Sequence, residues 1–184
     1  MRVVSGIAGG IPLIAPKTDL RPTMDRVKGA IFDSLGESII GARVLDLFSG
    51  SGSLGIEALS RGAAAADLVE KDARAEAAIR ANLAKTKLQG ATVHIMDVFS
   101  YLHRVAPEAV FNIIIADPPY AKAKGERDFG LELLGEPALA QALVPGGLFI
   151  LEKLPGAPVP KNSGWELLRE RRYGATEVAY LRRA

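Results

Sequence analysis

The sequence of 184 residues contains no cysteine, which excludes disulfide bonds and thiolate-ligated metal sites. Its two histidines, His94 and His103, do not belong to any His/Asp/Glu group with the spacing of metal ligands, so no metal is predicted. No apolar run approaches the roughly 18 residues that a membrane-spanning helix needs. The Met-Arg-Val-Val start also lacks the pattern of a secretion signal. A cytoplasmic protein without a membrane partner is therefore expected.

An excess of charge of one sign is lacking too. The 23 Lys and Arg residues nearly balance 21 Asp and Glu residues, for a net charge of +2, so a basic field over the whole surface is excluded. Residues 152–184 are less balanced, with seven Lys or Arg residues against four Glu. Two interpretations of this segment stay open, a solvated strand face and a nucleic-acid contact.

The length and a hydrophobic content of 48% indicate one globular domain with a core of its own. β-rich apolar runs alternate with helical patterns from Arg43 onward, which predicts a doubly wound α/β core over residues 43–184. Its seven-stranded sheet is expected to be mainly parallel. The parallel strands are predicted at Val44–Phe48, Asp67–Val69, Thr92–Met96, Phe111–Ala116 and Leu148–Leu151. The helices are predicted at about Ser53–Arg61, Ala73–Lys87 (with Asp72 as N-cap), Val98–Val105 and Phe129–Leu143.

The two ends of the chain depart from this alternation. Trp165–Tyr173 and Thr176–Leu181 predict a C-terminal antiparallel hairpin at the edge of the sheet. In the first 42 residues, MRVVSGIAGGIPLIAP predicts a β-hairpin, and RPTMDRVKGAIFDSLG predicts a helix with Thr23 as its N-cap. We therefore expect a single domain, residues 1–184, with an N-terminal hairpin–helix extension, and a monomer.

The stretch VLDLFSGSGSLGIEALSRG contains G-x-G-x-x-G at Gly50, Gly52 and Gly55. It lies between a predicted strand and a predicted helix, which is typical of a nucleotide cofactor site, because glycine permits a tight turn and a close approach of the backbone to a ligand. Glu70, 20 residues beyond Gly50, stands where a carboxylate can bind ribose hydroxyls. Both NAD and S-adenosylmethionine contain a ribose, so this motif alone does not distinguish them.

Asp46 favours S-adenosylmethionine. NAD would bring an anionic pyrophosphate to this loop, where a nearby carboxylate is unfavourable. S-adenosylmethionine has no phosphate, and its amino group and sulfonium are cations that a carboxylate attracts. An alternative role for Asp46, accepting hydrogen bonds from loop N–H groups, is compatible with this one.

A second motif, ADPPY, follows the fourth predicted strand. Asp117 and the carbonyl of Pro118 offer two acceptors that can orient the N–H groups of a planar amine toward a methyl donor. Pro119 stiffens the turn, and Tyr120 offers a flat ring on which a base can stack. The alternative is a proline-rich turn that only ends a strand. The glycine motif 67 residues upstream of Asp117 favours the amine site.

Together, DLFSGSGSLGIEALSRG and DPPY resemble the class I S-adenosylmethionine-dependent methyltransferases that act on amines. RVVSGIAGG and LRPTMDRVKGAIFDSL resemble the bacterial 16S rRNA guanine-N2 methyltransferases, and this resemblance covers nearly the whole chain. It implies a Rossmann-like fold and S-adenosyl-L-methionine as cofactor. It also implies methyl transfer to a guanine of 16S rRNA, with that RNA or the assembling small ribosomal subunit as partner. One departure is that Ile7, Ala8 and Gly9 stand where the family usually carries basic and aromatic residues.

The resemblance also implies roles for individual residues. The methionine end of the cofactor would contact Asp46, Ser49, Gly50 and Gly52, the ribose Glu70, and the adenine Asp97 and Val98. The target amine would lie at Asp117, Pro118, Pro119 and Tyr120, and the segment 21–28, which includes Thr23, would cover the methionine moiety and the base. Our candidates for contacts with RNA phosphates are Arg2, Arg21, Arg26, Lys122 and Lys124, each of which has a solvated surface charge as its alternative.

Three other functions remain open. The same chemistry can act on adenine N6 or cytosine N4 of DNA, or on a protein glutamine. An NAD-dependent oxidoreductase would need a catalytic Tyr/Lys pair or a His near the nicotinamide, and the sequence offers no such set. A non-catalytic RNA-binding assembly factor would have no need of the intact DPPY motif.

Overall fold

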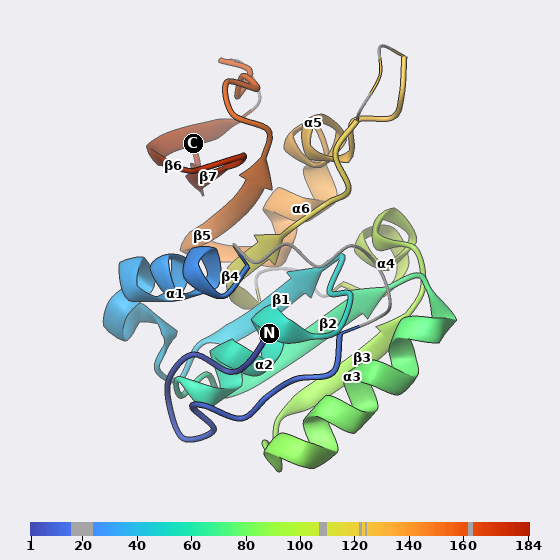
Figure 1. Ribbon diagram of the computed structural model, residues 1–184. Coiled ribbons are helices and arrows are strands. Elements are labelled where there is room, and N and C mark those ends of the chain that lie inside the picture. Colours follow the sequence, from blue (N-terminus) through green and yellow to red (C-terminus); the bar gives the residue numbers. More distant parts are fainter. Residues whose placement is uncertain (16–23, 107–109, 122, 124, 162–163) are drawn as a thin grey trace.

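A computed structural model describes residues 1–15, 24–106, 110–121, 123, 125–161 and 164–184 (Figure 1). Its strands form one sheet in the order β3-β2-β1-β4-β5-β7-β6. They are β1 (Arg43–Leu47), β2 (Ala65–Glu70), β3 (Ala91–Ile95), β4 (Phe111–Ala116), β5 (Leu143–Lys153), β6 (Trp165–Tyr173) and β7 (Thr176–Arg183). Strands β1 to β5 run parallel to one another, and β7 pairs antiparallel with both β5 and β6. The predicted doubly wound sheet with a C-terminal hairpin is confirmed.

Helices cover both faces of the sheet. They are α1 (Met24–Leu35), the 3-10 helix η1 (Gly36–Ile39), α2 (Ser53–Ser60), α3 (Ala73–Thr86), α4 (Val98–Arg104), α5 (Phe129–Leu134) and α6 (Pro137–Ala142). Helices α1, α2 and α3 pack on one face, and α4, α5 and α6 on the other. Neighbouring residues of β1 therefore enter different cores, Val44 on the α1 face and Leu45 on the α4 face. This two-sided burial explains the uninterrupted apolar runs of the central strands. Among the described residues, no helix combines the length and apolar character needed to cross a membrane.

The predicted single helix over Phe129–Leu143 is wrong. The chain forms α5 and α6 instead, separated at Gly135 and Glu136. Proline fits the first turn of a helix and not its interior, and Pro137 begins α6, with the Glu136 side chain accepting a hydrogen bond from Ala138 N at 3.0 Å. The last predicted helical residue, Leu143, already belongs to β5. This strand is longer than predicted, because it continues through the Pro-Gly-Gly sequence of residues 145–147.

The predicted N-terminal hairpin does not form regular strands. Its only β pairing in the described residues is an isolated antiparallel bridge between Arg2 and Pro12, supported by hydrogen bonds between Val3 and Ile11 and between Gly10 and Val3. The helix predicted after it is present as α1, whereas its predicted cap, Thr23, lies outside the described residues. Asp72 caps α3 as predicted and accepts a hydrogen bond from Arg74 N at 2.9 Å.

Candidate functional site

The loop between β1 and α2 contains the glycine motif, and its three glycines meet different structural requirements. Gly50 and Gly52 have φ angles of +53° and +77°, which L side chains rarely adopt. A Cβ atom on Gly52 or Gly55 would come within 2.8 or 2.9 Å of the Leu68 side chain. These two glycines therefore let α2 pack closely on β2. A Cβ on Gly50 would meet nothing within 4 Å, so the backbone there borders open space.

Asp46 is a fully buried carboxylate beneath this loop. Its Oδ2 accepts a hydrogen bond from Gly55 N at 2.8 Å, and its Oδ1 has no hydrogen-bond partner among the described residues. The pKa of Asp46 is raised to about 7, mainly by burial, with a smaller contribution from the charge of Glu70 and against the lowering effect of the Gly55 hydrogen bond. The buried Ser49 Oγ likewise has no partner in the described part of the chain. Both groups suit a ligand that brings a cation or a donor.

Glu70 ends β2 and ties the loop to the next strand. Its Oε2 accepts a hydrogen bond from Gly50 N and its Oε1 one from Asp72 N, both at 2.8 Å. Since each carboxylate oxygen can accept two hydrogen bonds, Glu70 can still receive ligand hydroxyls. This bond to Gly50 was not predicted from the sequence, and it means that Glu70 shapes the loop as well as facing any ligand there.

Asp97 and Val98 follow β3, at the same edge of the sheet. Asp97 is the N-cap of α4 and accepts a hydrogen bond from Ser100 N at 3.0 Å. It is half-buried, and Val98 is buried. This capping role of Asp97 was not predicted from the sequence. Apart from Thr23, which lies outside the described residues, the residues predicted to bind the cofactor thus stand at the carboxyl ends of three adjacent parallel strands, where ligands of open α/β sheets bind.

The DPPY motif begins directly after β4. Because Ala116 pairs with Leu47 of β1, Asp117 starts beside the glycine loop at the same edge of the sheet. Asp117 and Tyr120 are half-buried, Pro118 is buried and Pro119 is exposed. Pro118, Pro119 and Tyr120 line a pocket whose other wall comes from the end of β5 and from α5; its remaining lining residues are Ala121, Asp128, Gly130, Glu152, Lys153, Leu154 and Ala157.

The Tyr120 hydroxyl is held by two side chains that sequence reasoning missed. It hydrogen-bonds to Thr176 Oγ1, and it lies 3.3 Å from Glu152 Oε1. Thr176 Oγ1 in turn donates to Glu152 Oε1 at 2.8 Å. Glu152 belongs to β5 and Thr176 to β7. Their contact depends on the pairing of strands that are distant in the sequence, so no local sequence pattern predicts it.

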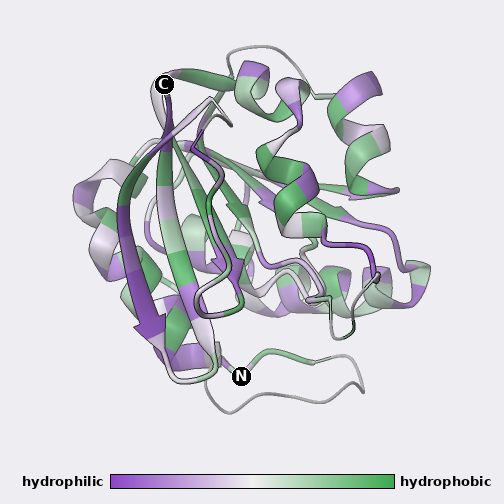
Figure 2. Ribbon diagram, turned by 90° about the horizontal axis from the view of Figure 1, so that it is seen from above, coloured by the Kyte–Doolittle hydropathy of each residue, from purple (hydrophilic) through white to green (hydrophobic). Residues whose placement is uncertain are grey.

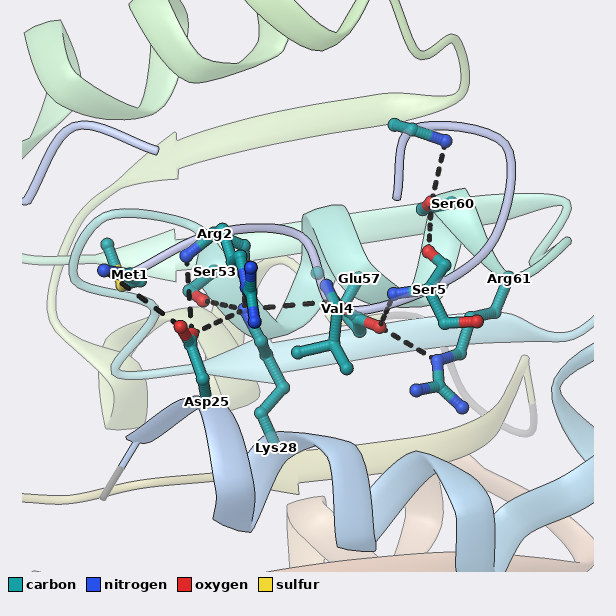
Figure 3. Close-up of polar contacts among 12 residues, drawn as sticks. Met1, Arg2, Val4, Ser5, Asp25, Lys28, Ser53, Glu57, Ser60 and Arg61 are labelled. Atoms are coloured by element: carbon teal, nitrogen blue, oxygen red, sulfur yellow. Dashed lines mark hydrogen bonds and ion pairs between the residues drawn. The ribbon is translucent and has the colours of Figure 1, made fainter. Parts of the chain in front are cut away.

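The N-terminal segment is fastened to α2 by a buried ionic cluster (Figure 3). Lys28 of α1 is only 3% exposed and donates from Nζ to Arg2 O at 2.6 Å and to Ser53 Oγ at 2.8 Å. Its Nζ also lies 3.6 Å from Asp25 and 3.7 Å from Glu57. Burial lowers the pKa of Lys28, against the opposite effect of these two carboxylates.

Glu57 lies at the centre of this cluster and is fully buried. Its two oxygens accept hydrogen bonds from Val4 N at 2.7 Å and Ser5 N at 3.0 Å, and Arg61 Nε lies 2.8 Å away. Ser60 adds bonds to Ala8 N and Ser5 O. Val4, Ser5 and Ala8 thus dock along the helix that follows the glycine loop. Of the segment 21–28, which was predicted to cover the site, the structure describes only Met24–Lys28, at the start of α1.

The predicted RNA contacts are only partly described. Arg2 and Arg26 are exposed, whereas Arg21, Lys122 and Lys124 lie outside the described residues. At the tip of the β6–β7 hairpin, Arg171 and Arg172 are also exposed. Tyr173, the next residue, pairs with Thr176, so this tip lies near the Tyr120 hydroxyl. Within the described ranges, no cluster of three His, Asp or Glu side chains could hold a metal ion.

Comparison with known proteins supports one family. A family model described as "Conserved hypothetical protein 95" matches residues 1–182. "Putative rRNA methyltransferase YlbH" of Bacillus subtilis is 39% identical over 97% of both chains. "Ribosomal RNA small subunit methyltransferase D" of Escherichia coli is 35% identical over 98% of this chain and 87% of that protein.

Among solved structures, "Putative methyltransferase yhhF" from Escherichia coli is similar with a TM-score of 0.78 and 33% identity, over 100% of this chain and 97% of that one. The sequence match and the structural match thus agree over nearly the full length of the chain. The chain belongs to the Conserved hypothetical protein 95 family, which the sequence resemblance to rRNA methyltransferases had indicated.

Proposed function

We propose that this protein transfers a methyl group from S-adenosyl-L-methionine to the exocyclic N2 amine of a guanine in 16S rRNA. The observation that carries the proposal is the register of β1 with β4. The Leu47–Ala116 pair brings the glycine loop, with its partly unpartnered Asp46, beside the DPPY motif. A cationic methyl donor and an amine acceptor can therefore meet at one edge of the sheet. The full-length relatives named as small-subunit rRNA methyltransferases support the choice of RNA.

The residues around the glycine loop fit S-adenosyl-L-methionine. Asp46 Oδ1 and Ser49 Oγ, buried and without partners among the described residues, suit the amino group of its methionine end. Glu70 suits its ribose hydroxyls, and Asp97 with Val98 suits its adenine. An NAD pyrophosphate would instead place anionic charge close to Asp46 and Glu70, which is unfavourable. When bound, the cofactor supplies a methyl group made electrophilic by the sulfonium.

Transfer would form a bond between guanine N2 and the methyl carbon as the carbon–sulfur bond breaks, with S-adenosylhomocysteine as the leaving group. Asp117 and the Pro118 carbonyl accept hydrogen bonds from the two N–H groups of the amine, which aims its lone pair at the methyl group. Tyr120 stacks on the base and fixes its plane. The methylated nitrogen becomes acidic and loses its proton late, so positioning contributes more than a strong base. The guanine must be unpaired or turned out of its helix to reach the pocket.

Contacts with RNA phosphates would come from exposed cations near this edge. Arg2 and Arg26 are exposed on the N-terminal side, and Arg171 and Arg172 at the hairpin tip on the other. Such contacts position the RNA without reading its sequence. The nearest alternative function, methylation of a DNA or protein amine, would use the same pocket with a different substrate.

A tritiated-methyl transfer assay tests the proposal. The protein is offered naked 16S rRNA, isolated small ribosomal subunits, genomic DNA and total protein, each with labelled S-adenosyl-L-methionine. We expect label in RNA, and nuclease mapping should recover it as N2-methylguanine. Label in DNA or protein instead would replace the proposed substrate, and the absence of label in every arm, with no binding of S-adenosylhomocysteine, would reject methyl transfer.

A further inference from the structure

We infer that Thr176 and Glu152 are positioning residues for the Tyr120 ring, and that they act through its hydroxyl group. The inference rests on the proposed function, in which the ring supports the target base. The hydrogen bonds from which it is argued do not depend on that function. Tyr120 O–H, Thr176 Oγ1 and Glu152 Oε1 form one connected hydrogen-bonded network.

The directions of these hydrogen bonds are constrained by the donors available. Glu152, as a carboxylate, can only accept, and each hydroxyl has one proton to donate. Thr176 donates to Glu152 Oε1 at 2.8 Å, which leaves a lone pair of Thr176 to accept from the Tyr120 hydroxyl. The order Tyr120 to Thr176 to Glu152 thus ends on a carboxylate, and bonds in such a chain strengthen one another.

The two holding residues stand on a fixed support. Thr176 is 5% exposed, and it begins β7, which pairs with the end of β5 through Lys153 and Glu177. Lys153 Nζ also links β5 to the two strands of the hairpin, because it lies 2.6 Å from Glu177 of β7 and 2.9 Å from Glu170 of β6. The hydroxyl of Tyr120 is therefore attached to the sheet itself, although Tyr120 lies in the loop beyond β4.

This attachment matters because a stacking ring contributes most when its orientation is set before the base arrives. A half-buried tyrosine with an unattached hydroxyl would have to be ordered at each encounter, which costs side-chain entropy. Fixing the ring in advance is preorganisation, and it raises the rate of the chemical step without new contacts to the cofactor.

Single-turnover methyl transfer at saturating S-adenosyl-L-methionine and RNA tests the inference. Tyr120→Phe and Thr176→Val each break the network while keeping side-chain shape. We expect each to slow transfer by about tenfold, the upper range for one neutral hydrogen bond. The double variant should be no slower than either single variant, because both changes cut the same chain. Thr176→Ser retains the hydroxyl and should restore the rate. Affinity for S-adenosylhomocysteine should stay unchanged throughout.

Thr86→Val is the matched control, because Thr86 also hydrogen-bonds through its hydroxyl, to Asn82 O within α3, and should leave the rate unchanged. NMR of protein labelled at the tyrosine Cζ gives a second measurement, which does not depend on methyl transfer. The Tyr120 signal, assigned by its loss in Tyr120→Phe, should shift in Thr176→Val and not in Thr176→Ser. An active wild type with an unchanged rate in both single variants, or additive losses in the double variant, would overturn the inference alone. A wild type without transfer to RNA would overturn the proposed function instead.

Discussion

The carboxylate of Asp46 accepts a single hydrogen bond from the protein, from Gly55 N at 2.8 Å, as far as the described residues extend. Its pKa is raised to about 7 by burial, so near neutral pH it carries a charge that the folded protein compensates poorly. We expect S-adenosylhomocysteine binding to weaken as the pH falls from 8 to 6, because protonation removes the partner of the amino group. Calorimetry over this range, with Asp46→Asn as the variant that should bind weakly at every pH, checks this.

The same pKa shift predicts a pH effect on stability. The folded pKa of Asp46, about 7, exceeds the unfolded value of about 3.9. The contribution of Asp46 to the free energy of unfolding is therefore greatest below the unfolded pKa and is lost as the pH rises through 7. We expect cofactor-free Asp46→Asn to lose less thermal stability than the wild type between pH 5 and pH 8. Parallel slopes of melting temperature against pH would contradict this assignment.

Asp117→Ala should leave S-adenosylhomocysteine binding intact and slow methyl transfer by about 10²-fold, the range for removal of one preorganised polar group. Asp117→Asn should be milder, because an amide oxygen still accepts one N–H bond. A general base would make both variants equally inactive, since neither side chain can take the proton. Single-turnover rates at saturating cofactor distinguish orientation from base catalysis.

Lys28→Met removes the cation that lies between Asp25, Glu57 and the start of α2. Breaking a buried ionic cluster leaves carboxylates without compensation, and we expect the free energy of unfolding to fall by about 3 kcal/mol. Chemical denaturation measures it. Arg80→Ala, which removes the exposed ion pair with Glu76, is the control and should have little effect. Equal midpoints for the two variants would show that the cluster does not fasten the N-terminal segment.

Gly50→Ala and Gly55→Ala should separate binding from packing. At Gly55 the new methyl meets the buried Leu68 side chain, so we expect a loss of about 1–3 kcal/mol in stability. At Gly50 nothing lies within 4 Å, and the cost in stability is the left-handed backbone alone, about 1 kcal/mol. Its methyl group would occupy the ligand side of the loop, so cofactor affinity should fall by about tenfold or more. Melting curves and calorimetry of both variants measure the two effects.

Arg171→Ala combined with Arg172→Ala should weaken RNA binding and flatten its dependence on salt, by about 0.7 in the logarithmic slope for each lost contact to single-stranded phosphate. Arg74→Ala combined with Arg80→Ala removes the same charge from α3, where both arginines are paired with acidic neighbours, and serves as control. If the two double variants have the same slope, the hairpin tip does not contact phosphate.

The position of the candidate site was predictable because each part of it is local. Gly50 and Asp117 both follow apolar runs that form parallel strands, and the carboxyl ends of adjacent parallel strands meet at one edge. The Tyr120 network was not predictable, since it requires the β5–β7 register that brings Thr176 to Glu152. The burial of Lys28 was not predictable either. A lysine on an amphipathic helix is usually exposed, and the partners that compensate its buried charge here come from distant segments, among them Glu57, Ser53 and Arg2 O.

Two differences between the sequence predictions and the structure have local explanations. Pro137 lies inside the segment that was predicted as one long helix, and proline ends or begins helices far more readily than it continues them. In the N-terminal segment, Gly6 and Gly10 both have positive φ angles, which supports turns without specifying strands. The segment pairs with itself through one isolated bridge, between Arg2 and Pro12, and side chains of α2 hold it against the core.

Strand β6 forms an outer edge of the sheet, with nine residues whose outward backbone groups lie next to no further strand of the described chain. Such an edge can recruit the same strand of another molecule and begin aggregation. Its exposed charges, among them Glu166, Glu170, Arg171 and Arg172, give it a hydrophilic surface (Figure 2). Charge on an edge strand opposes such recruitment. Replacing these charges to alter RNA binding should therefore also lower the solubility of the protein.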